Sequence, residues 1–353
     1  MGASRRAQLR DDDINPQHQP VTGDDHGPAT EEVRGLIRLY RDGHVERLPA
    51  VASVPSASTP DPDVVCEELI VAGGLTARLY LLPKLQALPL LVYFHGGGFC
   101  VGSAAWRCYH EFAARLAARA NCAVLSADYR LAPEHPLPAA YEDGLAVLRW
   151  VIHCASGELA RWRRLCDFSR VFLAGDSAGA AIAYHAALKN DAKSEAAAPL
   201  RGVILIQPFF GGAARTWSET NLPQSSKSAL SLATSDCYWR MALPAGADRD
   251  HRWCNPLAAK MPAEEASRLP ALLVCDSELD ILRDRSGEFC KAMSSAGVRV
   301  DQVTMAGVGH AFQILHNYPL SQARTSEMLT HIRDFINDRS KGRGRREDIK
   351  MAS

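Results

Sequence analysis

The chain has 353 residues, 40 Lys plus Arg against 40 Asp plus Glu, and 47% hydrophobic residues. This length fits one domain with a large core and a smaller addition. A net charge of zero gives no electrostatic basis for binding nucleic acid or an anionic membrane, and no apolar stretch is long enough to span a bilayer.

The cysteines and the N-terminus indicate the compartment. The ten cysteines show no C-x-x-C spacing, and the first twenty residues contain no apolar signal segment. We therefore expect a cytoplasmic protein with buried free thiols, and we expect no metal and no cofactor.

The N-terminal region divides into two parts. Residues 1–30 are polar and rich in Asp, Gln, His and Pro, so we predict that they are disordered. Residues 31–62, which end in a Pro/Ser-rich run, join this segment to the sheet and are the first part of a main domain at residues 31–338.

The main domain alternates strands and helices from about residue 90 onward, which predicts an α/β fold with a doubly wound, mostly parallel, eight-stranded sheet. The expected strands lie near 65–71, 77–82, 90–94, 122–127, 170–174, 201–206, 271–275 and 300–305. The expected helices lie near 109–120, 138–153, 178–189, 284–296 and 321–338.

Three consecutive glycines follow the apolar strand at 90–94, in the sequence H-G-G-G-F at residues 95–99. Such a loop offers bare backbone N–H groups and matches the loop that completes the oxyanion hole of esterases and lipases. A phosphate-binding loop is excluded because no Gly-Lys-Ser/Thr follows. We therefore expect Gly97 and Gly98 to donate to an oxyanion, and His95 to have a structural role.

The sequence G-D-S-A-G at residues 175–179 lies between the strand at 170–174 and a helix. In this context G-x-S-x-G forms a sharp turn that presents the serine at a helix N-terminus, whose N–H groups favour a developing anion. We predict that Ser177 is a nucleophile and that the N–H of Ala178 is a third oxyanion donor.

Residues 211–262 interrupt the alternation of strands and helices and are rich in Trp, Ser, Pro and Asp. A long insertion at this point predicts a lid, with residues 31–62 as its other part. Its aromatic residues either line a pocket or form the lid's own core; they are Trp217, Tyr238, Trp239 and Trp253.

The catalytic acid and histidine are expected after the serine, in that order along the chain. Asp276, Asp280 and Asp284 follow the strand at 271–275. Asp276 is still at the strand end and Asp284 is at the start of the next helix, so we assign Asp280, which lies in the loop, and keep the other two as rivals. His310 follows the strand at 300–305 in a loop of small residues, which is the position the base requires. Residues 339–353 form a basic tail that we predict to be disordered, although it also fits a nuclear-import signal.

Together these motifs resemble plant carboxylesterases of the hormone-sensitive-lipase type, a group that includes the gibberellin receptors. The resemblance covers roughly residues 31–338, and its matching stretches are at 95–102, 128–139, 175–179, 280–284 and 309–310. It implies an α/β-hydrolase that cleaves small apolar esters with Ser177, His310 and Asp280.

The same family supplies an alternative function. Gibberellin receptors resemble enzymes that have lost the catalytic histidine, and their loop reads H-G-G-S-F; they act through a protein partner. This chain has His310, and it has Gly98 where their serine falls. Segments at 208–216, 243–251 and 317–319 further resemble carboxylesterases that inactivate strigolactones, which implies such a hormone or another plant metabolite as substrate.

Overall fold

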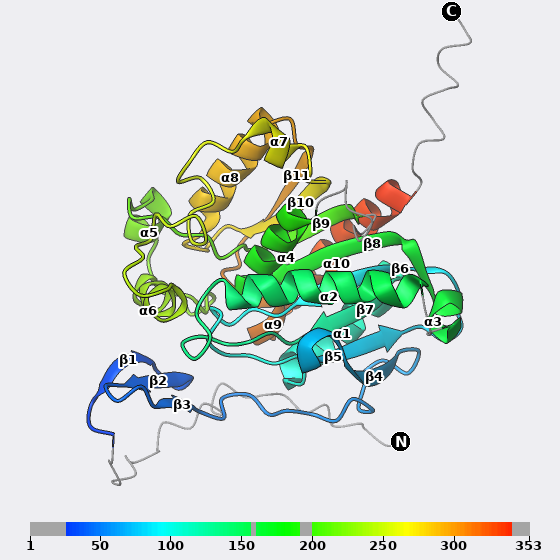
Figure 1. Cartoon of the computed structure of the whole chain (residues 1–353), viewed down its shortest axis with the longest axis horizontal. Coiled ribbons are helices and arrows are strands. Elements are labelled where there is room, and N and C mark those ends of the chain that lie inside the picture. The colour runs from blue at the N-terminus through cyan, green and yellow to red at the C-terminus, as the bar shows by residue number, and fades with distance from the viewer. Residues whose placement is uncertain (1–25, 157–159, 191–199, 341–353) are drawn as a thin grey trace, which may run out of the picture.

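The structure, a computed structural model, describes residues 26–156, 160–190 and 200–340 of the chain. Its centre is an eight-stranded sheet in the spatial order β11-β10-β9-β8-β6-β7-β5-β4 (Figure 1). These strands are β4 (Val65–Ile70), β5 (Thr76–Leu81), β6 (Leu88–Phe94), β7 (Ala123–Ala127), β8 (Cys166–Asp176), β9 (Leu200–Ile206), β10 (Ala271–Ser277) and β11 (Val300–Met305). β5 runs antiparallel to β4 and β7 on its two sides, and the other pairings of this sheet are parallel, so the predicted mostly parallel sheet is confirmed.

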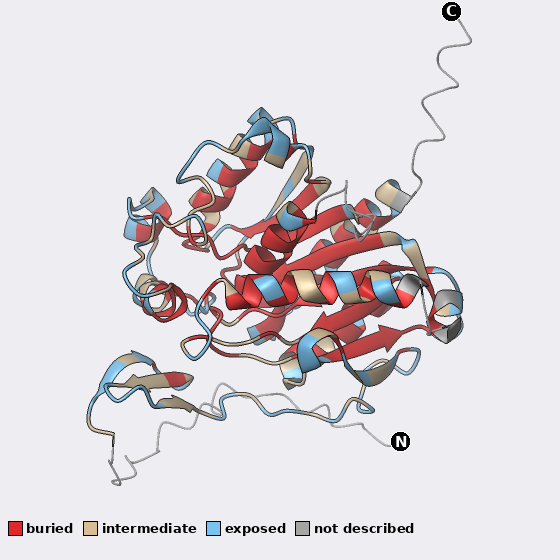
Figure 2. Cartoon of the chain, viewed as in Figure 1, coloured by how far each residue is buried: buried red, intermediate tan, exposed pale blue. Residues whose placement is uncertain are grey.

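Helices cover both faces of this sheet. On one face α2 (Ala139–Ser156) packs against α4 (Ala178–Lys189), and on the other α1 (Arg107–Ala120) packs against α10 (Pro319–Ser340) (Figure 1). The central strands are therefore buried on both sides, and every residue of β6 and β7 is buried (Figure 2). This burial explains why these strands are continuous apolar runs and why they could be predicted.

The remaining helices are mostly short. Besides α8 (Arg283–Ser295), which was predicted, they are α3 (Ala160–Leu165), α5 (Trp217–Asn221), α6 (Leu232–Ala242), α7 (Ala263–Ala266), α9 (Phe312–Leu315) and a 3₁₀ turn at Ala72–Gly74. Among the described residues, no helix is both long and apolar enough to cross a membrane.

A second, three-stranded antiparallel sheet precedes the main one and was not predicted. It contains β1 (Ala29–Val33), β2 (Ile37–Tyr40) and β3 (Val45–Arg47). It lies beside α6 of the insertion (Figure 1), where the carboxylate of Glu31 accepts two hydrogen bonds from Arg240 at 2.6 and 2.7 Å. The contact joins the two segments that we expected to form a lid; their action as a lid stays a prediction.

Two predicted boundaries of disorder are wrong. Ala29 and Thr30 already belong to β1: Ala29 pairs with Tyr40 of β2, and the Thr30 hydroxyl donates a hydrogen bond to the Leu39 carbonyl at 3.0 Å. At the other end, α10 continues to Ser340, and Arg339 donates a hydrogen bond to Asp301 at 3.1 Å. Residues 26–28 of the first predicted segment are described as well, and His26 stacks on His44 with ring centroids 3.9 Å apart. The rest of the two segments, residues 1–25 and 341–353, lies outside the described residues.

Candidate active site

Ser177 is the single residue between β8 and α4. Its backbone has φ 52° and ψ −118°, an unfavourable conformation for a residue with a side chain. The glycines on either side permit the turn by close approach: a Cβ on Gly175 would lie 2.2 Å from the backbone of Gly179, and one on Gly179 would lie 2.0 Å from the Phe94 carbonyl oxygen. The motif therefore folds into the turn that its sequence predicts, with Ser177 at the N-terminus of α4.

His310 and Asp280 lie in line with this serine. The Nε2 atom of His310 is 2.9 Å from Ser177 Oγ, and its Nδ1 atom is 2.7 Å from Asp280 Oδ2. The carboxylate only accepts hydrogen bonds, so Nδ1 carries the proton and Nε2 is free to accept the serine proton. The other carboxylate oxygen of Asp280 accepts the Leu282 N–H at 3.0 Å. The fold brings all three predicted residues together, and each of them is buried.

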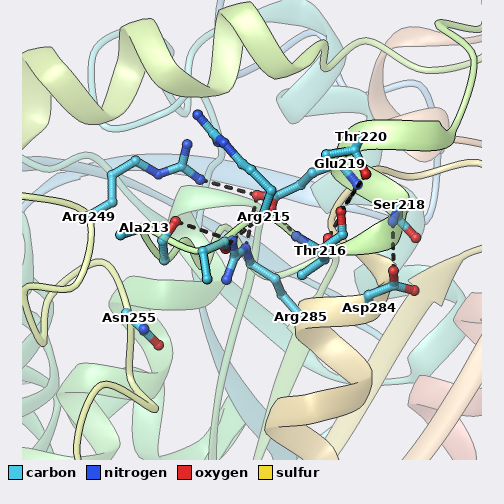
Figure 3. Close-up of polar contacts among 12 residues, drawn as sticks. Ala213, Arg215, Thr216, Ser218, Glu219, Thr220, Arg249, Asn255, Asp284 and Arg285 are labelled. Carbon is cyan, nitrogen blue, oxygen red and sulfur yellow. Dashed lines mark hydrogen bonds and ion pairs between the residues drawn. The ribbon is translucent and has the colours of Figure 1, made fainter.

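The two rival aspartates have other partners. Asp276 is still inside β10, where its Oδ2 accepts a hydrogen bond from Gln302 at 2.6 Å. Burial, with a smaller contribution from the Asp280 carboxylate, raises the pKa of Asp276 to about 6. Asp284 lies in the first turn of α8, and its Oδ2 accepts the backbone N–H of Ser218 in α5 at 2.7 Å (Figure 3).

Asp284 belongs to a larger set of polar contacts between the insertion and α8 (Figure 3). The buried carboxylate of Glu219 accepts two hydrogen bonds from Arg285 of α8, at 2.7 and 2.9 Å, and one from Arg249 at 3.1 Å. A cavity of about 290 Å³ beside this set is lined by residues of the insertion and of α8, and no triad residue lines it. These contacts fix the insertion to the helix that follows the catalytic acid.

The three predicted oxyanion donors come from the loop after β6 and from the start of α4. Gly97 has φ 116° and Gly98 has φ 60°, values that favour glycine. Within the described part of the chain, no group accepts a hydrogen bond from the N–H of Gly97, Gly98 or Ala178. These donors are therefore available to an anion formed beside Ser177.

Asp176 ties the glycine loop to the serine turn, and sequence reasoning missed this role. Its Oδ1 accepts the N–H of Gly96 at 3.0 Å and the hydroxyl of Tyr93 at 2.5 Å. A buried carboxylate that accepts two hydrogen bonds holds both partners firmly. Asp176 lies inside the G-D-S-A-G motif, and its position next to Ser177 is the one sequence feature that could have indicated this role. His95 also has structural contacts, with Nδ1 2.7 Å from the Gly96 carbonyl oxygen.

The four aromatic residues of the insertion have different environments. Tyr238 packs against Gly98, because a Cβ built on that glycine would lie 2.3 Å from the tyrosine ring. Trp239 is fully buried and stacks on Phe209 with ring centroids 4.7 Å apart. Trp217 is 60% exposed and Trp253 is half-buried. Tyr238 is therefore the one that contacts a predicted site residue, while Trp239 forms part of a core.

The insertion also holds the loop that carries His310. Ser228 Oγ accepts the His310 N–H at 3.1 Å, and the His310 carbonyl accepts the Ala229 N–H at 3.1 Å. The Lys227 carbonyl accepts the Gly309 N–H at 3.0 Å. No local sequence pattern indicated these contacts, which join residues about eighty positions apart.

A parallel sheet that presents a strained serine beside a buried histidine and aspartate defines a serine hydrolase. Comparison with known proteins agrees: residues 91–314 match a family model described as alpha/beta hydrolase fold. The chain belongs to this alpha/beta hydrolase family, in which it is a homologue of plant carboxylesterases.

Three relatives illustrate the similarity. The chain is 44% identical to probable carboxylesterase 6 of Arabidopsis thaliana, over 90% of this chain and 94% of that protein. It is 32% identical to the chloroplastic tuliposide A-converting enzyme 1 of Tulipa gesneriana, over 80% of this chain and 72% of that protein. A solved esterase of Pyrobaculum calidifontis is 27% identical, with a TM-score of 0.66 over 79% of this chain and 87% of that one. The prediction of a carboxylesterase is confirmed.

Proposed function

We propose that the chain hydrolyses small apolar carboxylic esters through a covalent acyl intermediate on Ser177. The observation that carries this proposal is the continuous contact from Ser177 Oγ through the His310 ring to Asp280, at 2.9 and 2.7 Å. A hydroxyl is a weak nucleophile until a base takes its proton, and here the base is within hydrogen-bond distance and is oriented by a carboxylate.

The reaction follows from these contacts. Ser177 Oγ attacks the ester carbonyl carbon while its proton moves to His310 Nε2, and the Asp280 carboxylate stabilises the imidazolium. The carbonyl oxygen becomes an oxyanion that accepts hydrogen bonds from the three backbone N–H groups. The imidazolium then protonates the leaving alkoxide, which departs as an alcohol. Water attacks the acyl-serine with His310 as base, and the carboxylic acid is released.

The apolar surroundings of the serine support an apolar substrate. Phe209 donates its N–H to the Ser177 carbonyl at 3.0 Å, and its ring contacts those of Tyr238 and Trp239. Aromatic rings packed beside a nucleophile favour an apolar acyl or alcohol group over a charged one. Within this class, the three segments that resemble strigolactone-inactivating carboxylesterases support a strigolactone-type ester as the natural substrate.

The test measures turnover of p-nitrophenyl esters of rising acyl length, with a strigolactone analogue alongside. We expect Ser177→Ala to lose activity by about a million-fold while the protein stays folded, and we expect an organophosphate to label the wild-type serine stoichiometrically. Near wild-type turnover by the alanine variant would refute the role of Ser177. Hydrolysis of p-nitrophenyl esters without cleavage of the analogue would refute the narrower substrate proposal alone.

A receptor is the alternative outcome of the same test. His310→Val removes the base and leaves the oxyanion donors, so under the proposal it loses turnover and still binds a non-hydrolysable ligand. A wild-type protein that turns over no short ester, yet captures a partner protein when ligand is present, would favour the receptor.

A further inference from the structure

Gln207 follows directly after β9 and has an unusual backbone. Its φ of 48° lies in the left-handed region, which is unfavourable for a residue with a side chain. Its side chain is buried, and its N–H donates to the Cys275 carbonyl of β10 at 2.8 Å. A strained and buried polar residue persists only where its contacts hold it in place.

The carboxamide of Gln207 holds the peptide groups on both sides of His310. Its Oε1 accepts the Ala311 N–H at 2.8 Å, and its Nε2 donates to the Gly309 carbonyl at 3.0 Å and to Ser277 Oγ. If the amide were reversed, its NH₂ group would face the Ala311 N–H and its oxygen would face the Gly309 carbonyl oxygen. The contacts therefore fix the orientation of the amide. Ala311 itself has a left-handed φ of 58°, which makes the backbone after the histidine a sharp turn.

We infer that Gln207 is a positioning residue, which keeps the backbone around His310 in the conformation that places Nε2 within reach of Ser177 Oγ. The inference rests on the proposed hydrolase function. The direction of an imidazole follows from the backbone that carries it, and a misplacement of about 1 Å in a reacting group can lower a rate about a hundred-fold. Without the carboxamide, the Gly309 carbonyl and the Ala311 N–H lose their partner, and the turn can rearrange.

The test compares two glutamines of the same region. Gln207→Met keeps the length of the side chain and removes all three carboxamide contacts. Gln313→Met is the matched control: Gln313 is buried in α9, three residues after His310, and its amide atoms have no partner among the described residues. Both variants place the same thioether in a buried position near the histidine.

We expect Gln207→Met to lower kcat by about 10–100-fold with KM within about twofold of wild type, because ground-state binding does not use the His310 orientation. Gln313→Met should keep a kcat near wild type. A merely structural role for Gln207 would lower the melting temperature without this selective loss of kcat in the folded fraction.

A second variant provides a test if Gln207→Met does not fold. Gln207→Glu keeps an oxygen that accepts the Ala311 N–H but turns its other oxygen toward the Gly309 carbonyl, so its kcat should fall between wild type and Gln207→Met. The inference is overturned if the folded Gln207 variants have the kcat of Gln313→Met, or if the loss lies wholly in KM. A wild-type protein that hydrolyses no ester would overturn the proposed function and this inference with it; an active wild type beside unimpaired Gln207 variants overturns this inference alone.

Discussion

The ring of Tyr238 occupies the space in which a side chain on Gly98 would lie: a Cβ built there would be 2.3 Å from the ring's Cγ atom. The contact joins α6 of the insertion to the loop that carries two of the three predicted oxyanion donors. Position 98 is therefore restricted to glycine while Tyr238 is in place. Gibberellin receptors, whose loop resembles H-G-G-S-F, have a serine at the corresponding position.

This contact predicts a coupling between the two residues. Gly98→Ala should lower kcat/KM by about 10–100-fold, since the added methyl displaces either the loop or the ring. Adding Tyr238→Ala removes the clash and leaves only the strain at φ 60°, so part of the lost activity should return. A double-mutant cycle on kcat/KM measures this coupling, and strictly additive effects would contradict it.

Asp280 and Asp284 are expected to respond differently to the same substitution. Asp280→Asn leaves His310 without the acceptor that fixes its tautomer, so turnover should fall about ten-thousand-fold. Asp284→Asn should keep near wild-type kcat, because an amide oxygen can still accept the Ser218 N–H. The measurement is kcat of the two folded variants. If Asp284→Asn is inactive and Asp280→Asn is active, Asp284 and not Asp280 is the catalytic acid.

The raised pKa of Asp276 predicts that the free energy of unfolding depends on pH. Its pKa is about 6 in the folded protein against 3.8 for an ordinary aspartate, so between these values the native state binds a proton that the unfolded chain has lost. Stability conferred by the protonated form therefore declines as the pH rises from about 4 to about 6, by at most about 3 kcal/mol.

Asp276→Asn removes this titration while keeping an acceptor for Gln302. The variant should match wild type in urea unfolding at pH 4 and exceed it in the free energy of unfolding at pH 8. The same difference between the two proteins at both pH values would show that Asp276 is not the titrating group.

The cysteines should be unreactive in the native protein. All ten are free, and eight of them are buried. Burial raises the pKa of Cys66 and of Cys237 to about 11, and that of Cys122 to about 12, so little reactive thiolate exists at neutral pH. Ellman's reagent should react slowly before unfolding and with ten thiols in urea, without loss of activity in the native state. Rapid labelling that inhibits the native enzyme would contradict this. The cytoplasmic location stays a prediction.

The parts of the site that could be predicted are those that local sequence determines. Ser177 and the glycine loop are specified by turns whose residue types are restricted, and His310 by its place after a strand. Asp280 followed from where β10 ends and α8 begins.

The residues that support the site could not be predicted in this way. Gln207 lies 104 residues before its partner Ala311 along the chain, and Ser228 lies 82 residues before its partner His310. No periodicity of the sequence indicates such contacts, because they join segments that only the tertiary fold brings together. The N-terminal sheet was missed for a different reason: its strands have three to five residues and are mostly half-buried or exposed, so their apolar alternation is weak.

The hydrogen bonds between residues 227–229 and the loop of His310 restrict how the insertion can be exchanged. A chimera that takes its whole insertion from a relative, from residue 211 to residue 262, replaces the support of the His310 loop together with the aromatic residues of the insertion. Such a chimera could lose activity because the His310 imidazole is displaced or because the substrate preference has changed, and the loss alone does not distinguish the two causes. Grafts that retain residues 227–229 and vary α6 separate these two effects, so the chain offers a boundary within the insertion at which specificity can be redesigned while the proton-transfer geometry is preserved.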